Sequence, residues 1–387
     1  MTEQVFSAAE RRRSLSAVIM SSAAIGVHFG VMIPAVTLTL ESWGVRPTVI
    51  GLNAAMQPLA LLLFSAFLPR IIGRLGALPC LFGGLVVATA AALLMPLLPN
   101  LTAWFVFRFL MGLGMALPWL VGETWINIVA APESRGRVVA LYGIAFFGGL
   151  AVGPLVLQAV GGTGWPPFLA AAGAVVVAAL PFAVYARLAP AMPAVPEIRF
   201  LQAAAVAPLM IGAAVIAGIT EVATYAMLPL YGLRNGLGEA ASVTLLTVFT
   251  LGALALQWPL GALADRFGAR RLLLASAAAG IGLCLLLPPA MATPLLLWPL
   301  IFAWGGVTLA FYTLGLAHLG HRFPRAQLAV ANAVFIVGFE AGNVAGPSLA
   351  GAAMEIWDPH GLPGFLAAAL AVFLAIGLLR RPPRDTG

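Results

Sequence analysis

Five ionisable side chains lie inside long apolar stretches of this sequence, where side chains of these types can bind a substrate or carry protons. They are His28, Arg108, Glu123, Glu221 and Glu340. A charge at the centre of a lipid bilayer costs about 2.5 kcal/mol or more, so such residues mark functional sites by default. Carboxyl groups and imidazoles can load and release protons. We therefore take these five residues as candidates for proton coupling.

Arg108 and Glu123 share the apolar stretch 101–130. A lone buried arginine needs a partner, so Arg108 serves either a coupling or substrate site or a structural hydrogen bond to a neighbouring helix. Glu123 lies near the other end of the stretch. It either exchanges a proton or forms a salt bridge with Arg135 or Arg137, which would fix the following loop at the helix end.

Glu221 lies in the segment GITEVATYAML, with Thr224 and Tyr225 three and four residues further on. On a helix these three side chains share one face. A carboxyl group beside a hydroxyl and a phenol is suited to a substrate or proton site. The alternative is a polar cluster that packs helices together.

Glycines at helical spacing accompany the other two candidates. Gly338, Gly342 and Gly346 form a ridge of small residues that lets helices approach closely. Glu340 lies roughly 200° around the helix from Gly342, on the same side as Asn343. Its alternative role is pairing between helix bundles. Likewise, Gly26 and Gly30 predict a packing face from which His28 points away, and His28 either relays protons or hydrogen-bonds a backbone carbonyl.

Aromatic and hydrogen-bonding residues in the same stretches are candidates to line a substrate cavity. They are Asn53, Gln57, Trp119, Trp125, Asn127, Thr224, Tyr225, Tyr312 and Asn343. Tryptophan and tyrosine also anchor helices at membrane interfaces. For Trp43, Trp165 and Trp357 this role is a better explanation than a place in the cavity.

Composition identifies an integral membrane protein of the all-α class. The chain is 62% hydrophobic and 9% charged, with a mean hydropathy of +1.03. Apolar runs of about 20 residues recur without the alternation of a membrane barrel, and each is long enough to span the bilayer as a helix. We predict twelve spans, at 16–40, 48–69, 77–98, 101–130, 138–160, 165–187, 203–231, 241–263, 272–290, 295–319, 328–354 and 362–379. The first reads as a retained span and not as a signal peptide.

Charge placement predicts the orientation of these spans. All basic residues are arginines, and only Arg46 and Arg234 fall on one side of the membrane, apart from Arg108 within a span. Both termini are therefore expected in the cytoplasm. The net charge of +7 reflects this asymmetry and indicates no nucleic-acid partner. Cys80 and Cys284 lie in apolar runs, so we expect no disulfide, and we expect no metal and no cofactor.

The sequence is internally duplicated. GALADRFGARR, from Gly261, has a weaker copy in PRIIGRLGA, from Pro69, so that Arg74 matches Arg266 and Gly76 matches Gly268. A Gly-x-x-x-Gly-Pro pattern ending at Pro154 recurs, ending at Pro347. Duplicated apolar halves are typical of secondary transporters. We expect two six-helix domains, 1–186 and 203–387, joined by a proline-rich cytoplasmic linker at 187–202.

These motifs resemble those of the major facilitator superfamily across essentially the whole chain. The loop motif GALADRFGARR, the RFLMGLG segment from Arg108, the GGLAVGP segment ending at Pro154 and the loop PESRGR carry the resemblance. Two departures are Gly73, which stands where the second copy has Asp265, and Leu157 with Gln158, where the Gly/Pro motif continues with glycines.

The resemblance implies two pseudo-symmetric six-helix bundles around a cavity that opens alternately to either side. Spans 1, 4, 7 and 10 would line the cavity, and the arginine of the RFLMGLG segment would be linked to proton movement. Gating would rest on the loop motif, through Gly261, Asp265, Arg266, Gly268 and Arg74. Asp265 and Arg266 would form an ionic latch near Glu133 and Arg135.

No nucleotide-binding motif is present, so we expect a secondary transporter driven by an ion gradient. The leading prediction is proton-coupled antiport that exports a small organic molecule across a bacterial inner membrane, by a monomer. Proton-coupled uptake is the alternative. A non-transporting sensor and a membrane-embedded enzyme are the other classes, although the four histidines do not converge on a catalytic centre.

Overall fold

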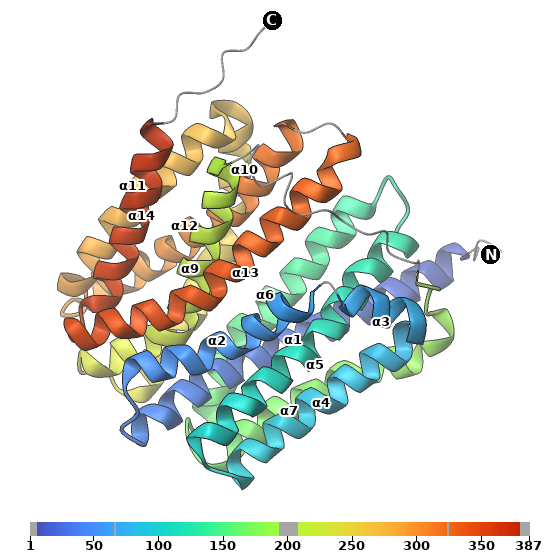
Figure 1. Ribbon diagram of the computed structural model, residues 1–387, viewed down its shortest axis with the longest axis horizontal. Helices are drawn as coiled ribbons and strands as arrows, with labels where there is room; N and C mark the ends of the chain where they lie inside the picture. The colour runs from blue at the N-terminus through green and yellow to red at the C-terminus, as the bar shows by residue number, and fades with distance from the viewer. Residues whose placement is uncertain (1–5, 66, 193–207, 323–324, 380–387) are drawn as a thin grey trace, which may run out of the picture. The chain divides into compact units, whose positions relative to one another are not determined.

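The computed structural model describes residues 6–65, 67–192, 208–322 and 325–379, with side chains left out at 208 and 317–330. In this part of the chain the regular structure is helical throughout, with thirteen α-helices and one short 3-10 helix (Figure 1). Twelve of the α-helices are long and apolar enough to cross a membrane, which confirms the predicted twelve spans. The α-helices are α1 (Ala8–Ser42), α2 (Pro47–Phe64), α3 (Leu68–Leu75), α4 (Ala77–Leu97), α5 (Leu101–Val129), α6 (Arg135–Val160), α7 (Trp165–Val184), α9 (Pro208–Arg234), α10 (Glu239–Phe267), α11 (Ala269–Ala290), α12 (Pro294–Arg322), α13 (Arg325–Ile356) and α14 (Gly361–Leu379).

The predicted second span, 48–69, is longer than the helix in the structure. The structure ends α2 at Phe64 and begins the separate helix α3 at Leu68. Pro69 occupies the first turn of α3, where a missing backbone N–H costs nothing, so it favours a new helix start. The matching helix of the second half, α10, runs without a break from Glu239 to Phe267.

The duplication is visible in the backbone. Gly76 ends α3 and Gly268 ends α10, and both have a φ of 87°. Side chains other than hydrogen rarely tolerate this conformation, so both copies of the turn require glycine. The turns at the ends of the two loop motifs therefore share this requirement, although the first motif has lost the aspartate.

Close packing of α1 on α6 and of α9 on α13 depends on the predicted glycine faces. Gly26 lies against the backbone of Phe146, and an added Cβ at Gly30 would lie 2.9 Å from the Cα of Gly153. In the second half, an added Cβ at Gly346 would lie 2.8 Å from the Cα of Ile219. The absence of side chains at these positions lets the helix backbones meet.

The chain divides into two compact units, which are described separately. The first comprises Met1–Val45, Asn53–Glu197 and Glu239–Thr250, and the second comprises Arg46–Leu52, Ile198–Gly238 and Leu251–Gly387. The first part of α2, through Leu52, thus belongs to the second unit, and the first part of α10, through Thr250, belongs to the first unit. Of the predicted linker 187–202, residues 193–202 lie outside the described part, and the predicted domain boundaries stay a prediction.

Contacts within each unit hold these helix ends. In the first unit, the Thr247 hydroxyl of α10 donates to the carbonyl of Ala151 in α6 at 2.9 Å, and the Gln158 amide donates to the Thr244 hydroxyl at 2.8 Å. In the second unit, the backbone of Pro47 lies against Gly351 of α13. The start of α10 is therefore fixed to α6, and the start of α2 is fixed to α13.

Replacing Ser14 with alanine is expected to destabilise the first unit by about 1–3 kcal/mol. The Trp125 indole N–H donates to the Ser14 hydroxyl at 2.7 Å, and that hydroxyl donates to the carbonyl of Leu188 at 3.1 Å. Both side chains are fully buried, so alanine leaves the indole N–H without an acceptor. Thermal unfolding in detergent measures the effect. Ser16→Ala is the control, because that hydroxyl bonds only within α1, and equal melting temperatures for the two variants would refute the assignment.

Candidate functional site

Arg108 and His28 are buried together in the first unit. Arg108 of α5 is 2% exposed and His28 of α1 is fully buried. Because a carbonyl can only accept, His28 Nδ1 carries the proton and donates to the carbonyl of Ala171 at 3.0 Å. Arg108 Nε and Nη1 and His28 Nε2 have no hydrogen-bond partner among the described residues. The two side chains are near enough to interact electrostatically. The predicted hydrogen bond from His28 to a backbone carbonyl is therefore present, but it leaves Nε2 without a partner among the residues described.

Asn53 and Gln57 of α2 belong to the same site. Both are buried, one turn apart, and Asn53 Nδ2, Asn53 Oδ1 and Gln57 Nε2 lack partners in the described part of the chain. An added Cβ at Gly112 of α5 would lie 2.6 Å from the Cα of Gln57, so α2 and α5 are in contact there. These helices cross the membrane in the same direction, since a single span, α4, intervenes. One turn earlier on each helix, Arg108 is therefore level with Asn53. We name His28, Asn53, Gln57 and Arg108 the arginine cluster.

Glu123, near the end of α5, is exposed and forms no ion pair with Arg135 or Arg137, all of which the structure describes. Its carboxyl group interacts with Trp119, one turn earlier. The Asn127 amide, also exposed, donates to the backbone carbonyl of Glu123 at 3.0 Å. The predicted loop-fixing salt bridge is thus absent from the described residues.

An aromatic wall beside Glu123 was not predicted. Trp119 makes edge-to-face contacts with Tyr142 at 6.2 Å and with Phe146 at 5.0 Å, measured between ring centroids. Both residues belong to α6, one turn apart. Their spacing of four residues in a predicted span was the available signal. Trp125, in contrast, is fully buried against Phe182 and bonded to Ser14, so its expected place in a cavity is wrong and its role is packing.

Two carboxyl groups lie close together in the second unit. Glu340 of α13 is 9% exposed, and its Oε2 accepts a hydrogen bond from Asn343 Nδ2 at 3.2 Å, as their predicted common face requires. Glu221 of α9 is close enough to interact electrostatically with Glu340. Gly218, one turn before Glu221, lets Asn343 approach α9. No described arginine or histidine pairs with either carboxylate. We name Glu221, Glu340 and Asn343 the acid cluster.

Of the other predicted cavity residues in the second unit, Thr224 and Tyr225 lie on α9 and Tyr312 lies on α12. The Thr224 hydroxyl donates to the carbonyl of Thr220 and accepts from Trp304 Nε1 at 3.3 Å, so helix packing occupies it. Tyr225 is buried. Tyr312 of α12 contacts Phe339, with ring centroids 4.9 Å apart. Trp304 was missed because nothing in its apolar segment distinguishes it. The predicted cavity roles of these residues stay predictions.

The predicted gating residues lie at helix ends. Arg74 is in the last turn of α3, and Asp265 and Arg266 are in the last turn of α10, all exposed. The Arg266 guanidinium carbon lies 5.3 Å from the centre of the Phe267 ring. An added Cβ at Gly261 would meet nothing within 4 Å, so Gly261 is not required for packing. The latch with Glu133 and Arg135 stays a prediction.

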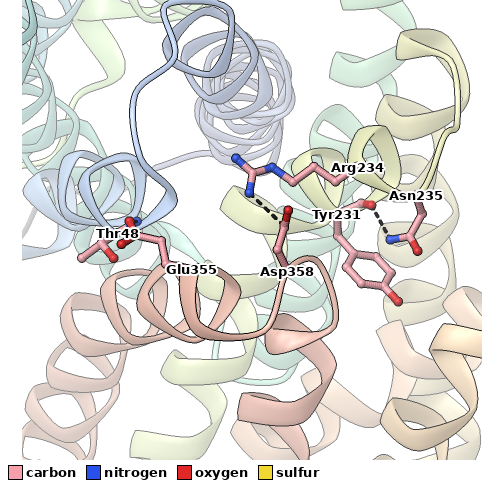
Figure 2. A network of polar contacts seen from close by, with 6 residues as sticks. All are labelled: Thr48, Tyr231, Arg234, Asn235, Glu355 and Asp358. Carbon is pink, nitrogen blue, oxygen red and sulfur yellow. Dashed lines mark hydrogen bonds and ion pairs between the residues drawn. The ribbon is translucent and has the colours of Figure 1, made fainter.

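A second polar group joins helix ends of the second unit and was not predicted (Figure 2). The Glu355 carboxylate accepts from the backbone N–H of Thr48 at 2.9 Å, so the end of α13 caps the first turn of α2. Arg234 forms an ion pair with Asp358 at 2.9 Å, and Tyr231 Oη lies 3.4 Å from His360 Nδ1. The Arg234 pair is partly exposed, which limits its stabilisation to about 0–1 kcal/mol.

Twelve apolar helices that enclose buried ionisable side chains define a multi-pass α-helical membrane protein. The chain belongs to the Major Facilitator Superfamily, whose model matches residues 16–246 and 209–387. It is a transporter and not an enzyme.

Relatives and solved structures agree with this assignment. The chain is 26% identical over 361 residues to the uncharacterized MFS-type transporter YfkF of Bacillus subtilis, covering 91% of this chain and 92% of the relative. It is 25% identical over 292 residues to the uncharacterized MFS-type transporter YcaD of Salmonella typhimurium, covering 73% of each. A D-xylose-proton symporter structure has a TM-score of 0.76 at 12% identity, covering 96% of this chain and 98% of the other. A mutant of the nucleoside transporter NupG has a TM-score of 0.76 at 11% identity, covering 94% and 99%. At these identities the structures show a shared fold.

Proposed function

We propose that this protein exports a small organic molecule in exchange for protons, by alternating access across a bacterial inner membrane, with both termini in the cytoplasm. The acid cluster carries the proposal. Two carboxylates in apolar surroundings repel each other, and no described cation neutralises them. A proton bound by Glu221 or Glu340 relieves this repulsion, so the pair is suited to accept and release protons.

A glycine motif favours exchange, and an exposed carboxyl group favours proton coupling. The Gly-x-x-x-Gly-Pro segment of α6 resembles a motif often associated with antiporters of the family, although Leu157 and Gln158 stand where that motif continues with glycines. Its glycines pack directly on α1. Glu123 is exposed beside the aromatic wall, where a carboxyl group can exchange protons with water. Uptake by proton symport would use the same carboxyl groups, and the direction of coupled flux distinguishes the two.

The test uses inverted membrane vesicles that have been energised to an acidic interior and contain a pH-reporting dye. Pools of lipophilic cations, neutral metabolites and organic anions are added in turn. For wild type, we expect one pool to release protons from the vesicles, and we expect Glu221→Gln to abolish this release. Glu10→Gln is the carboxyl control, because glutamine preserves the capping interaction of Glu10 with Ser7 at the start of α1.

The sign of the response decides between mechanisms. Proton release on addition supports exchange, whereas further acidification as substrate enters supports symport. Transport that proceeds at equal rate with a collapsed proton gradient would refute proton coupling altogether.

A further inference from the structure

The arginine cluster contains more hydrogen-bonding capacity than the first unit uses. Six of its side-chain nitrogen and oxygen atoms are buried without a partner: His28 Nε2, Asn53 Nδ2, Asn53 Oδ1, Gln57 Nε2, Arg108 Nε and Arg108 Nη1. Buried polar atoms in native proteins nearly always have partners, so a group of unpaired ones on three helices requires an explanation. The natural explanation is a ligand that supplies the missing partners.

The charge of the cluster identifies what kind of ligand fits. Four of the six atoms are nitrogens that donate, on Arg108, Asn53 and Gln57. Arg108 has no acidic partner among the described residues. Glu123 is on the same helix, but fifteen residues further on, or about 22 Å along the axis. A buried guanidinium surrounded by amide donors binds a carboxylate or phosphate group, which accepts several hydrogen bonds and neutralises the charge.

We propose that the arginine cluster binds an anionic oxygen group, a carboxylate or a phosphate, of the transported molecule. Arg108 would neutralise the anion, and the Asn53 and Gln57 amides would donate to its oxygen atoms. His28 is fixed by its bond to Ala171, so Nε2 lines the site from the side of α1. The transported molecule is therefore an organic anion, which narrows the substrate class of the proposed function and rests on it.

One side of α5 extends from the arginine cluster to the exposed end of the helix. Met115, Trp119 and Glu123 follow Arg108 at spacings that place them on one side of the helix. That side is buried at Met115, partly exposed at Trp119 and exposed at Glu123.

Thermal unfolding of the purified protein in detergent tests anion binding. The probes are butyrate, phenylacetate, succinate and inorganic phosphate, with butyramide, phenylacetamide and phenethylamine as neutral and cationic counterparts. We expect at least one of the anions to raise the melting temperature. We expect the two amides and the amine to leave the melting temperature unchanged. If phosphate alone acts, the group is a phosphate. If no anion acts, or if the amides or the amine act equally, the proposal is overturned.

Substitutions then locate the site. Arg108→Gln is expected to abolish the anion-induced shift, and Arg108→Lys, which keeps the charge but loses the planar guanidinium, to weaken binding about tenfold. Asn53→Ala keeps Arg108 and its charge, and it is expected to reduce the anion-induced shift in melting temperature. The test therefore does not depend on whether the Arg108 variants fold. Arg12→Gln removes an exposed arginine as the control. Unchanged anion shifts in Arg108→Gln would overturn the proposal.

The protein without ligand gives an independent readout. If Arg108 is unpaired until an anion binds, then Arg108→Met replaces an uncompensated buried charge with an apolar side chain and raises the melting temperature in the absence of anions. A lower melting temperature would mean that Arg108 has a structural partner, and would overturn the proposal.

Failure of this proposal differs from failure of the proposed function. If a neutral or cationic compound releases protons from vesicles with wild type and Arg108→Gln alike, proton-coupled export stands and the anion site falls. If anions bind through Arg108 but no pool releases protons, the anion site stands and proton exchange falls.

Discussion

Replacement of Glu340 by glutamine is expected to slow proton-coupled transport by about 100-fold, the lower end of what one positioned acid–base group contributes. Glutamine keeps the size of the side chain and its bond with Asn343, since its amide oxygen still accepts from Nδ2. It cannot bind and release a proton. The repulsion between Glu340 and Glu221 disappears as well, so the pair no longer responds to the proton gradient.

The measurement is substrate-induced proton flux in the inverted vesicles, normalised to the amount of folded transporter. Glu10→Gln is again the carboxyl control, at the exposed start of α1. Substrate exchange in the absence of a gradient should persist in Glu340→Gln, because exchange requires no net proton movement. Wild-type proton flux in Glu340→Gln and in Glu221→Gln would exclude the acid cluster as the coupling site.

Replacement of Gly153 by valine is expected to prevent most of the protein molecules from folding. An added Cβ would lie 2.5 Å from the Cα of Gly30, a backbone atom that cannot move aside without separating α1 from α6. Overpacking of a tight core costs about 1–3 kcal/mol, and more where backbone blocks backbone. By the duplication, Gly346→Val in α13 should have the same effect, since its Cβ would lie 2.8 Å from the Cα of Ile219.

Gly148→Val is the matched control for that experiment. Gly148 precedes Gly149 in the same motif, but an added Cβ there meets nothing within 4 Å. The readout is the monodisperse fraction after detergent extraction, together with its melting temperature. Equal yields of Gly153→Val and Gly148→Val would mean that α1 and α6 do not need glycine to pack.

Much of the fold was predictable because its signals are local in sequence. Apolar length alone located the twelve spans, and glycines at helical spacing located the faces on which α1 and α6, and α9 and α13, meet. The break between α2 and α3 was not predicted, because a proline is accepted in a first turn as readily as it interrupts a helix. Sequence periodicity cannot separate these two roles.

The candidate sites were predictable only as separate residues. Burial costs flagged Arg108 and Glu340, but nothing in the sequence places Asn53 and Gln57 beside Arg108. That juxtaposition depends on a tertiary contact between α2 and α5, at Gly112, and no local pattern encodes it. Trp125 shows the opposite error, because a tryptophan in a cavity-lining helix and one in a helix interface have the same local sequence.

The capping of α2 by Glu355 bears on the order in which the chain assembles. The two bonded residues are 307 positions apart, so α2 is synthesised long before the helix that caps it. The chain leaves the ribosome from its N-terminus, and early segments enter the membrane before later ones exist. The bond from the Thr48 N–H to Glu355 therefore cannot form until α13 has been synthesised, and it completes a helix that begins among the first fifty residues.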